Sequence, residues 1–212
     1  MGSAPVRALR ASPVRTLRAP KHDAILDAAK RVFLREGYSA SMDLVAAEAG
    51  VSKQTVYNHF GSKEGLFRAI VDHASGELLD ALGDGDARAD PAATLEAVAR
   101  RFLSMLLAPS HLALHRMLVA EAPRFPDLAR EIYLGGPAHA ARELAHYLAQ
   151  ESRKGTLAVA DPALAAEQFF GALCGHLHLR ALLSPRDAPG EAEIERAITH
   201  AVRSFLRAHA GR

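Results

Sequence analysis

The sequence predicts an all-α fold, and three observations support this prediction. Alanine and leucine are the commonest apolar residues in a 212-residue chain that is 49% apolar and only 6% aromatic. Such a composition favours helices over strands. Apolar residues also recur at three- and four-residue intervals, whereas the two-residue alternation of a strand is not found in the sequence. We expect about nine helices.

The first helix is expected to begin near Lys21. Its inward side should carry apolar residues spaced as one face of a helix, namely Ile25, Ala28, Ala29, Val32 and Phe33. Gly37 follows this stretch and is typical of the glycine that ends a helix in the left-handed conformation. The first helix should therefore end just before Gly37.

Two short helices, separated by a glycine turn, are expected next. Ser41 is a favourable N-cap for the second helix, and Asp43 suits the positive end of that helix dipole. Gly50 can adopt the left-handed turn conformation at low steric cost. Ser52 then caps a third helix over 53–59. Together the two helices predict a helix-turn-helix unit.

Glycine and proline mark the ends of the remaining helices. Asp90-Pro91 and Asp161-Pro162 each place an N-cap carboxylate before a proline at the first helical position. Residues 83–86 form a turn-rich linker. The expected helices cover 63–82, 91–106, 111–121, 127–134, 137–153, 162–183 and 191–209.

Charge is unevenly distributed along the chain. Residues 1–21 contain five basic residues and no acidic residue, although the whole chain has a formal net charge of only +2. The same stretch contains prolines and repeats PVRALRA as PVRTLRA, which favours a flexible arm. A basic arm suits contact with an anionic polymer, and a leader without a role is the alternative.

The single cysteine limits the chemistry of the chain. Cys174 alone excludes an intramolecular disulfide and a zinc site built on cysteines. One free thiol suits a reducing compartment, so we expect a cytoplasmic protein. The sequence has no run of 18 apolar residues, and we therefore expect no transmembrane helix and no membrane partner.

The third helix predicts a surface that reads DNA. A helix this short needs its neighbours for stability, and Val56 and Phe60 are its inward-facing residues. Its outward side chains can hydrogen-bond nucleic acid, and they are Lys53, Gln54, Thr55, Tyr57 and Asn58. Glutamine and asparagine can bond adenine edges, and threonine can contact a thymine methyl group. Gln54 and Thr55 are the first candidates for base contacts, and an ordinary solvated face is the alternative.

A longer string of residues surrounds this helix. It comprises Gly37-Tyr38, Val45-Ala46, Ala49-Gly50-Val51-Ser52, Thr55-Val56-Tyr57-Asn58-His59-Phe60, Ser62-Lys63-Glu64 and Leu66-Phe67. With this string, residues 23–70 resemble the DNA-binding domain of the TetR family of transcription regulators. The resemblance covers about a quarter of the chain.

The resemblance implies a set of DNA contacts. Tyr57, His59 and Lys63 would hold phosphates, and Lys63 would do so in the first turn of its helix. Ala40 stands where the family often has threonine, so Ser41 is the candidate for the phosphate contact there. The expected DNA-binding residues are therefore Ser41, Ser52, Lys53, Gln54, Thr55, Tyr57, Asn58, His59 and Lys63.

The resemblance also implies a dimer. Two-fold dimers of this kind read two half-sites about 34–36 Å apart along DNA. The last two long helices, 162–183 and 191–209, are the candidates for the homodimer interface, as a four-helix bundle. We thus expect a basic arm (1–21), a DNA-binding domain (22–68) and a domain for effector binding and dimerisation (69–212).

The helical body is expected to hold a small-molecule pocket. Apolar walls with a few polar groups suit such a site. The candidates are Phe102, Met105, His115, Phe125, Tyr133, Phe169, Phe170 and His176, and ordinary core packing is the alternative for each of them. The apolar character of most of these candidates suggests a hydrophobic or aromatic effector. The pairs His111/His115 and Cys174/His178 share helix faces, but buried packing is favoured over a metal, and no cofactor is expected.

We expect a sequence-specific transcription regulator, a repressor that a small-molecule effector releases from a palindromic operator on double-stranded DNA. A constitutive DNA-binding protein without a ligand, or an activator, is the alternative. An enzyme is the rival class. The sequence has no glycine-rich phosphate loop, nucleophile elbow or metalloprotease helix, so enzymatic activity is not expected.

Overall fold

The computed structural model describes residues 20–83 and 90–211, with side chains at 21–73 and 90–211. The predicted arm lies outside the described residues, except that Pro20 and Lys21 begin the first helix. Most of the predicted linker at 83–86 also lies outside them.

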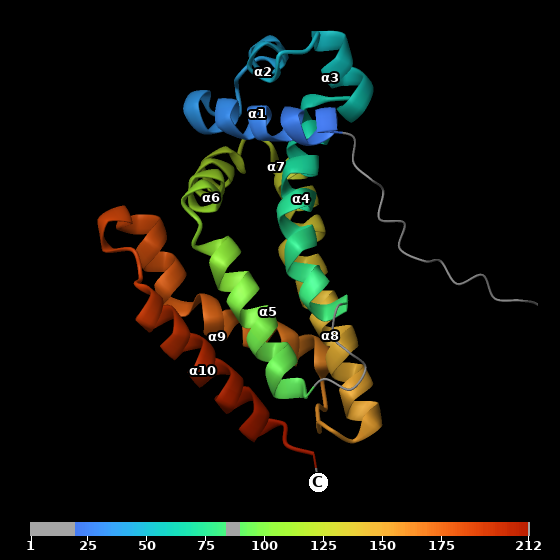
Figure 1. Ribbon diagram of the computed structural model, residues 1–212, viewed down its shortest axis with the longest axis vertical. Helices are drawn as coiled ribbons and strands as arrows, with labels where there is room; N and C mark the ends of the chain where they lie inside the picture. The colour runs from blue at the N-terminus through green and yellow to red at the C-terminus, as the bar shows by residue number, and fades with distance from the viewer. Residues whose placement is uncertain (1–19, 84–89, 212) are drawn as a thin grey trace, which may run out of the picture.

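The all-α prediction is confirmed. The described residues form ten α-helices, one in each of the ten stretches where the sequence predicts a helix, together with a 3-10 turn at Pro185–Asp187 and one isolated bridge between Leu157 and Ala210. The helices, labelled in Figure 1, are α1 (Pro20–Glu36), α2 (Met42–Ala49), α3 (Lys53–Phe60), α4 (Lys63–Gly83), α5 (Pro91–Leu106), α6 (Pro109–Glu121), α7 (Pro126–Gly135), α8 (Pro137–Lys154), α9 (Pro162–Leu183) and α10 (Glu191–Ala208).

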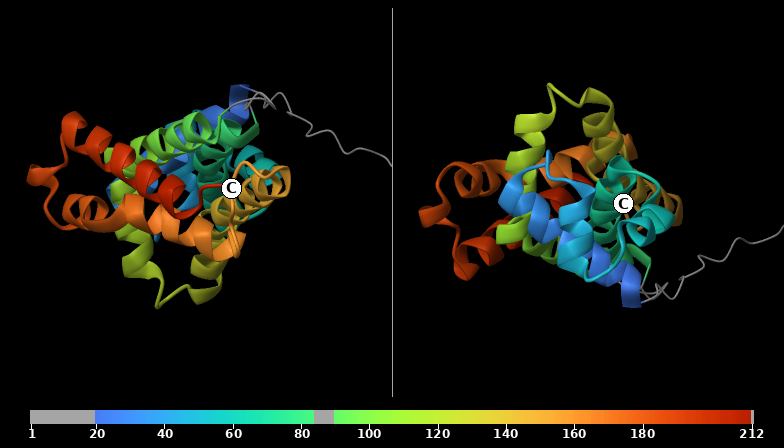
Figure 2. Two further views of the ribbon diagram at one scale, coloured as in Figure 1. Left: turned by 90° about the horizontal axis from the view of Figure 1, so that it is seen from below. Right: turned by 90° about the horizontal axis from the view of Figure 1, so that it is seen from above.

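The first three helices form one end of the molecule. Figure 1 shows α1 lying across the top of the body, with α2 and α3 on its far side and α4 descending from it into the body. The helices α9 and α10 form a hairpin, and their connecting loop projects to one side in both views of Figure 2. The helix-turn-helix therefore lies at the opposite side of α1 from the helical body.

The capping signals in the helix-turn-helix are confirmed. The Ser41 hydroxyl accepts a hydrogen bond from the Leu44 amide at 3.3 Å, and the Ser52 hydroxyl accepts one from the Thr55 amide at 3.1 Å. Gly50 has a φ of 66° and lies in the left-handed region, where a side chain would be strained. These contacts fix the angle between α2 and α3.

The helices pack around two hydrophobic cores. The first, the body core, takes its residues from α5, α8, α9 and α10 and includes Leu103, Leu148 and Phe169. The second, the head core, is built on α1 to α4 and also takes Leu128 and Ile132 from α7. Side chains of α6, among them Leu114, Met117 and Leu118, pack against the head core. The DNA-binding end thus shares its core with α6 and α7.

The later helices depart from the prediction in two places. The helix α6 begins at Pro109, two residues earlier than predicted, because proline suits the first turn of a helix. The helix α9 is not continuous, since Gly175 has a φ of 30° and a ψ of −134° and interrupts it. A residue with a β-carbon rarely adopts a φ of this sign, so glycine is needed at the break.

Among the described residues, no helix taken singly has the length and apolar content to cross a membrane. Within the same part of the chain, α5 and α6 together reach that length and composition, and a bend of 67° separates them.

Candidate nucleic-acid interface

The helix α3 is anchored on one side and exposed on the other. Val56 is fully buried in the head core, and Phe60 packs against the same core. The side chains on the opposite side of the helix reach solvent, and the exposed ones are Lys53, Gln54, Tyr57, Asn58 and His59. The helix therefore offers a polar surface of the kind that enters the major groove, and we call α3 the recognition helix.

Two of the candidate base-reading residues are joined to each other. The Gln54 side-chain amide donates a hydrogen bond of 2.9 Å to the Asn58 carbonyl oxygen, one helical turn away. This bond restrains both side chains and leaves the Gln54 oxygen and the Asn58 amide group free for base edges. The pair therefore presents an acceptor and a donor next to one another, which is the pattern that adenine requires.

The hydroxyl of Thr55 already has a hydrogen-bond partner within the protein surface, the hydroxyl of Ser52. Its oxygen lies 2.8 Å from the Ser52 hydroxyl oxygen, within the N-cap of α3. Thr55 is only partly exposed. Its methyl group remains the more available part for a thymine contact.

An acidic side chain pairs with the cation at the start of the recognition helix. The Lys53 ammonium lies 2.8 Å from an Asp43 carboxylate oxygen on α2, and both side chains are exposed. This hydrogen bond raises the pKa of Lys53, so the lysine stays charged. Sequence reasoning placed Asp43 only at the end of a helix dipole, because a pairing across ten residues leaves no local signal.

Two cations on α1 are also paired with a carboxylate on α2. Arg31 donates to Glu48 at 2.9 Å, and Arg35 lies 3.5 Å from the other oxygen of Glu48. The hydrogen bond from Arg31 is the main reason that the pKa of Glu48 is lowered. These pairs weaken the positive potential of the head, so DNA attraction must be local.

The phosphate candidates lie in two different settings. His59 is exposed, and its ring lies 6.2 Å from that of His22 at the start of α1, with Phe60 beside both rings. Lys63 is only partly exposed, and its ammonium lies 4.7 Å from the centre of the Tyr38 ring. Burial lowers the pKa of Lys63. The structure therefore places His59 with the recognition helix and directs Lys63 toward an aromatic ring.

The structure brings only some of the predicted effector residues together. Phe102 and Phe170 lie 4.6 Å apart between ring centres and, with Met105 and Phe169, belong to the body core. Phe125 packs instead against the head core. Tyr133 and His176 are exposed, and His115 faces His178. Aromatic content alone therefore did not identify one cavity.

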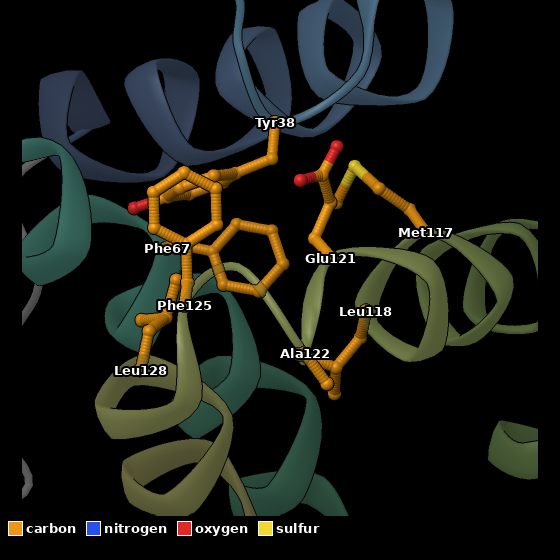
Figure 3. A pocket seen from close by; sticks show the side chains of 8 residues that line it. All are labelled: Tyr38, Phe67, Met117, Leu118, Glu121, Ala122, Phe125 and Leu128. Carbon is orange, nitrogen blue, oxygen red and sulfur yellow. The ribbon is translucent and has the colours of Figure 1, made fainter.

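Two hollow spaces do occur in the described part of the chain. A small space between α6 and the aromatic residues of the head core, shown in Figure 3, is lined by Tyr38, Phe67 and Phe125 and has a volume of about 10 Å³, which is only the size of one water molecule. An open groove of about 330 Å³ lies between α5 and the start of α10. Its walls include Arg100, Leu103, Ser104, Leu107, Pro189 and Ile194. No local pattern pointed to this groove, because its walls come from segments about 90 residues apart.

Two family descriptions match most of the folded chain. Residues 25–70 match bacterial regulatory proteins of the tetR family, and residues 93–211 match the C-terminal domain of AefR-like transcriptional repressors. The second match covers more than half of the chain. The chain therefore belongs to the TetR family of DNA-binding transcription regulators, and the resemblance inferred from its sequence is confirmed.

Curated relatives match over a short stretch of the chain. The transcriptional regulator AlkX of Mycobacterium tuberculosis is 39% identical over 64 residues, which is 30% of each chain. The transcriptional repressor ComR of Escherichia coli is 48% identical over 52 residues, which is 24% of each chain. The match thus spans less than a third of the length of these relatives.

Solved structures match over nearly the whole chain. A TetR-family transcriptional regulator from Mesorhizobium loti is 31% identical, with a TM-score of 0.77 over 90% of this chain and 96% of that one. The flavonoid-responsive regulator FrrA is 34% identical, with a TM-score of 0.69 over 91% of this chain and 98% of that one. The likeness therefore includes the helical body as well as the helix-turn-helix.

The Asp43–Lys53 pair should limit non-specific attraction to DNA. We expect Asp43→Asn to raise the affinity for non-specific duplex DNA about two- to fivefold. In this variant Lys53 has no carboxylate partner that competes with a DNA phosphate for its ammonium group. The slope of the logarithm of the binding constant against the logarithm of the salt concentration should steepen by about 0.9, because Lys53 is then free to neutralise one more phosphate.

Fluorescence anisotropy over a salt series measures both quantities. Asp127→Asn is the matched control, because Asp127 is also exposed in the first turn of a helix but lies on α7. Equal gains in the two variants would show that net charge alone, and not the pair, sets this affinity.

Proposed function

We propose that this protein is a homodimeric repressor that binds a palindromic operator and leaves it when a small effector binds the helical body. The observation that carries the proposal is the recognition helix, whose polar side is exposed while Val56 fixes the opposite side in the head core. Repression is supported by the description of the matching C-terminal family as that of transcriptional repressors.

Base reading is assigned to the Gln54–Asn58 pair and to the Thr55 methyl group. Ser41, Ser52, Lys53, Tyr57 and His59 surround them on exposed positions and are assigned to the phosphate backbone. Lys63 is kept as a phosphate candidate, although its ammonium must leave the Tyr38 ring to reach one.

The dimer interface is assigned to α9 and α10. Three leucine side chains on α9 are exposed to solvent: Leu164 by 50%, Leu179 by 53% and Leu183 by 76%. Most other large apolar side chains among the described residues are buried, so this exposed apolar face is suited to contact with another protein. Figure 2 shows that the α9–α10 hairpin stands out from the body, where a second copy can approach it. A two-fold contact there would place two recognition helices on the same face of a duplex.

The effector is assigned to the groove between α5 and α10. Its volume lies at the lower end of the range for small-molecule sites. Its walls are mostly apolar, and Arg100 and Ser104 are the polar residues that line it. Both hydrogen bonds of Arg100 go to Glu195 on α10, at 3.1 and 2.8 Å, so they hold the groove's two walls together. FrrA is described as flavonoid-responsive. We infer that the effector here is likewise a hydrophobic or aromatic compound.

Release follows from a shift between two arrangements of the dimer. An effector that binds the arrangement with the wrong spacing of recognition helices draws the protein off DNA by its differential affinity alone. Because α6 and α7 share the head core, a displacement of α5 would reach the recognition helix through α6.

Operator recognition is tested by selecting bound DNA from a random pool and footprinting the product. We expect two symmetric half-sites about one helical turn apart. Gln54→Ala should lower affinity for this operator by about 1–3 kcal/mol, or about 5- to 150-fold, while non-specific binding is retained. A footprint without symmetry, or a Gln54→Ala protein with full operator affinity, would argue against the proposal.

Dimerisation is tested by placing a charge on the exposed face of α9. Leu179→Asp should weaken self-association by about 100-fold or more, because an unpaired carboxylate would be buried in the interface. Analytical ultracentrifugation measures this change. Val119→Asp, at an even more exposed position on α6, is the control and should leave the dimer intact. A Leu179→Asp protein that remains dimeric would place the interface elsewhere.

The groove is tested with a large side chain at its exposed edge. Ser104→Trp should fill the groove and reduce about tenfold or more the response of operator binding to a panel of flavonoids, without changing operator affinity in their absence. Ala93→Trp, at an exposed position on the same helix, is the control. If Ser104→Trp responds like the unaltered protein, the effector does not use this groove.

A further inference from the structure

Three histidines lie where the two cores meet. His111 and His115 are on α6, one helical turn apart, and His178 is on α9. The rings of His115 and His178 are 4.9 Å apart between centres and inclined at 61°. We call these three residues the histidine seam. The helix α6 packs against the head core, while α9 belongs to the body core, so the seam joins the DNA-binding end to the body.

A second contact holds the same two helices together. Arg116, next to His115, donates two hydrogen bonds of 2.8 Å to the carbonyl oxygens of Ala181 and Leu182, at the C-terminal end of α9. These carbonyls have no partner within the helix, so the guanidinium caps α9 from the side of α6. The seam and this cap are therefore parts of one α6–α9 contact.

The seam is built for neutral imidazoles. Nε2 of His178 is buried and has no hydrogen-bond partner among the described residues. The charged groups that act on the three rings are Lys30 from α1 and Arg116 from α6, together with the rings themselves. All of these are cationic when protonated, so a proton placed in the seam meets both a desolvation cost and repulsion.

The titration of the seam follows from this environment. Burial, then the neighbouring histidines and Lys30, lowers the pKa of His111 to about 4. Burial also lowers the pKa of His115, with a further contribution from Arg116. Burial and the nearby His115 lower the pKa of His178.

We propose that the histidine seam is a proton-operated switch, in which protonation separates α6 from α9 and weakens operator binding. The inference rests on the proposed function, because it takes operator affinity to depend on how the head is held against the body. No bound metal is invoked, since the described residues form no group of three ligands able to hold one.

The direction of the effect follows from proton linkage. Histidine has a pKa of about 6.5 in water, so an open seam takes up protons below that pH, whereas His111 in the closed seam resists protonation down to about pH 4. The closed seam is therefore fully favoured above about pH 6.5. At pH 5.5, His111 alone shifts the equilibrium toward the open seam by about tenfold, and the other two rings add to the shift.

The test compares operator affinity at pH 7.5 and pH 5.5, at constant ionic strength and with EDTA present. The unaltered protein should lose affinity by about fivefold or more relative to the His111→Gln/His115→Gln/His178→Gln protein, in which none of the three rings is left to take up a proton. His176→Gln is the matched control, because His176 is exposed on the same helix two residues away, and it should follow the unaltered protein. Circular dichroism checks folding, and the single variant His111→Gln replaces the triple one if that protein does not fold.

Equal pH dependence in all three proteins would overturn the switch while leaving the proposed function in place. Failure of every protein to bind the selected operator at pH 7.5 would instead remove the proposed function. A titration of the imidazole proton resonances tests the seam in the absence of DNA. At least two of the eleven histidines should titrate well below pH 6.5, and titration of all eleven near that value would overturn the proposal.

Discussion

The burial of one side of α3 is the constraint on which the DNA-binding end depends. An eight-residue helix does not form alone in water, so its geometry must come from its neighbours. Val56 holds α3 in place by packing into the head core, which also contains the contacting rings of Phe33, Phe67 and Tyr38. The caps at Ser52 and Gly50 then set the direction of the helix. With these contacts in place, the polar side can only face outward.

The same head core explains how a distant part of the chain can influence DNA binding. Leu128 and Ile132 of α7 are buried in it, and α6 packs against it, so residues far beyond the helix-turn-helix contribute to this core. The path from the body runs through α5 into α6, and through the contact between Arg116 and the end of α9. Both the groove and the histidine seam lie along this path. Effector and protons would thus act on one mechanical link from different sides.

Local signals predicted the secondary structure well. The caps at Ser41 and Ser52 and the left-handed Gly50 depend on nearest neighbours, and each was confirmed. The apolar spacing of α1 likewise identified its buried side. The break at Gly175 was missed because the sequence around it is largely apolar and a lone glycine is often tolerated in a helix.

Contacts between distant segments could not be predicted from the sequence. Asp43 meets Lys53, and Lys63 turns toward Tyr38, only because separate helices cross at fixed angles. The expected effector residues separated for the same reason, since aromatic residues mark cores in general and their composition does not say which core each one enters.

The shared head core also bears on how such regulators diverge and are recombined. A recognition module cut at the end of the helix-turn-helix would leave behind the apolar surfaces of α6 and α7 that complete its interior. A hybrid regulator that grafts this head onto another body must therefore carry α6 and α7 with it, or supply side chains of matching shape from the recipient. The transferable unit is thus discontinuous in sequence, although it is continuous in space.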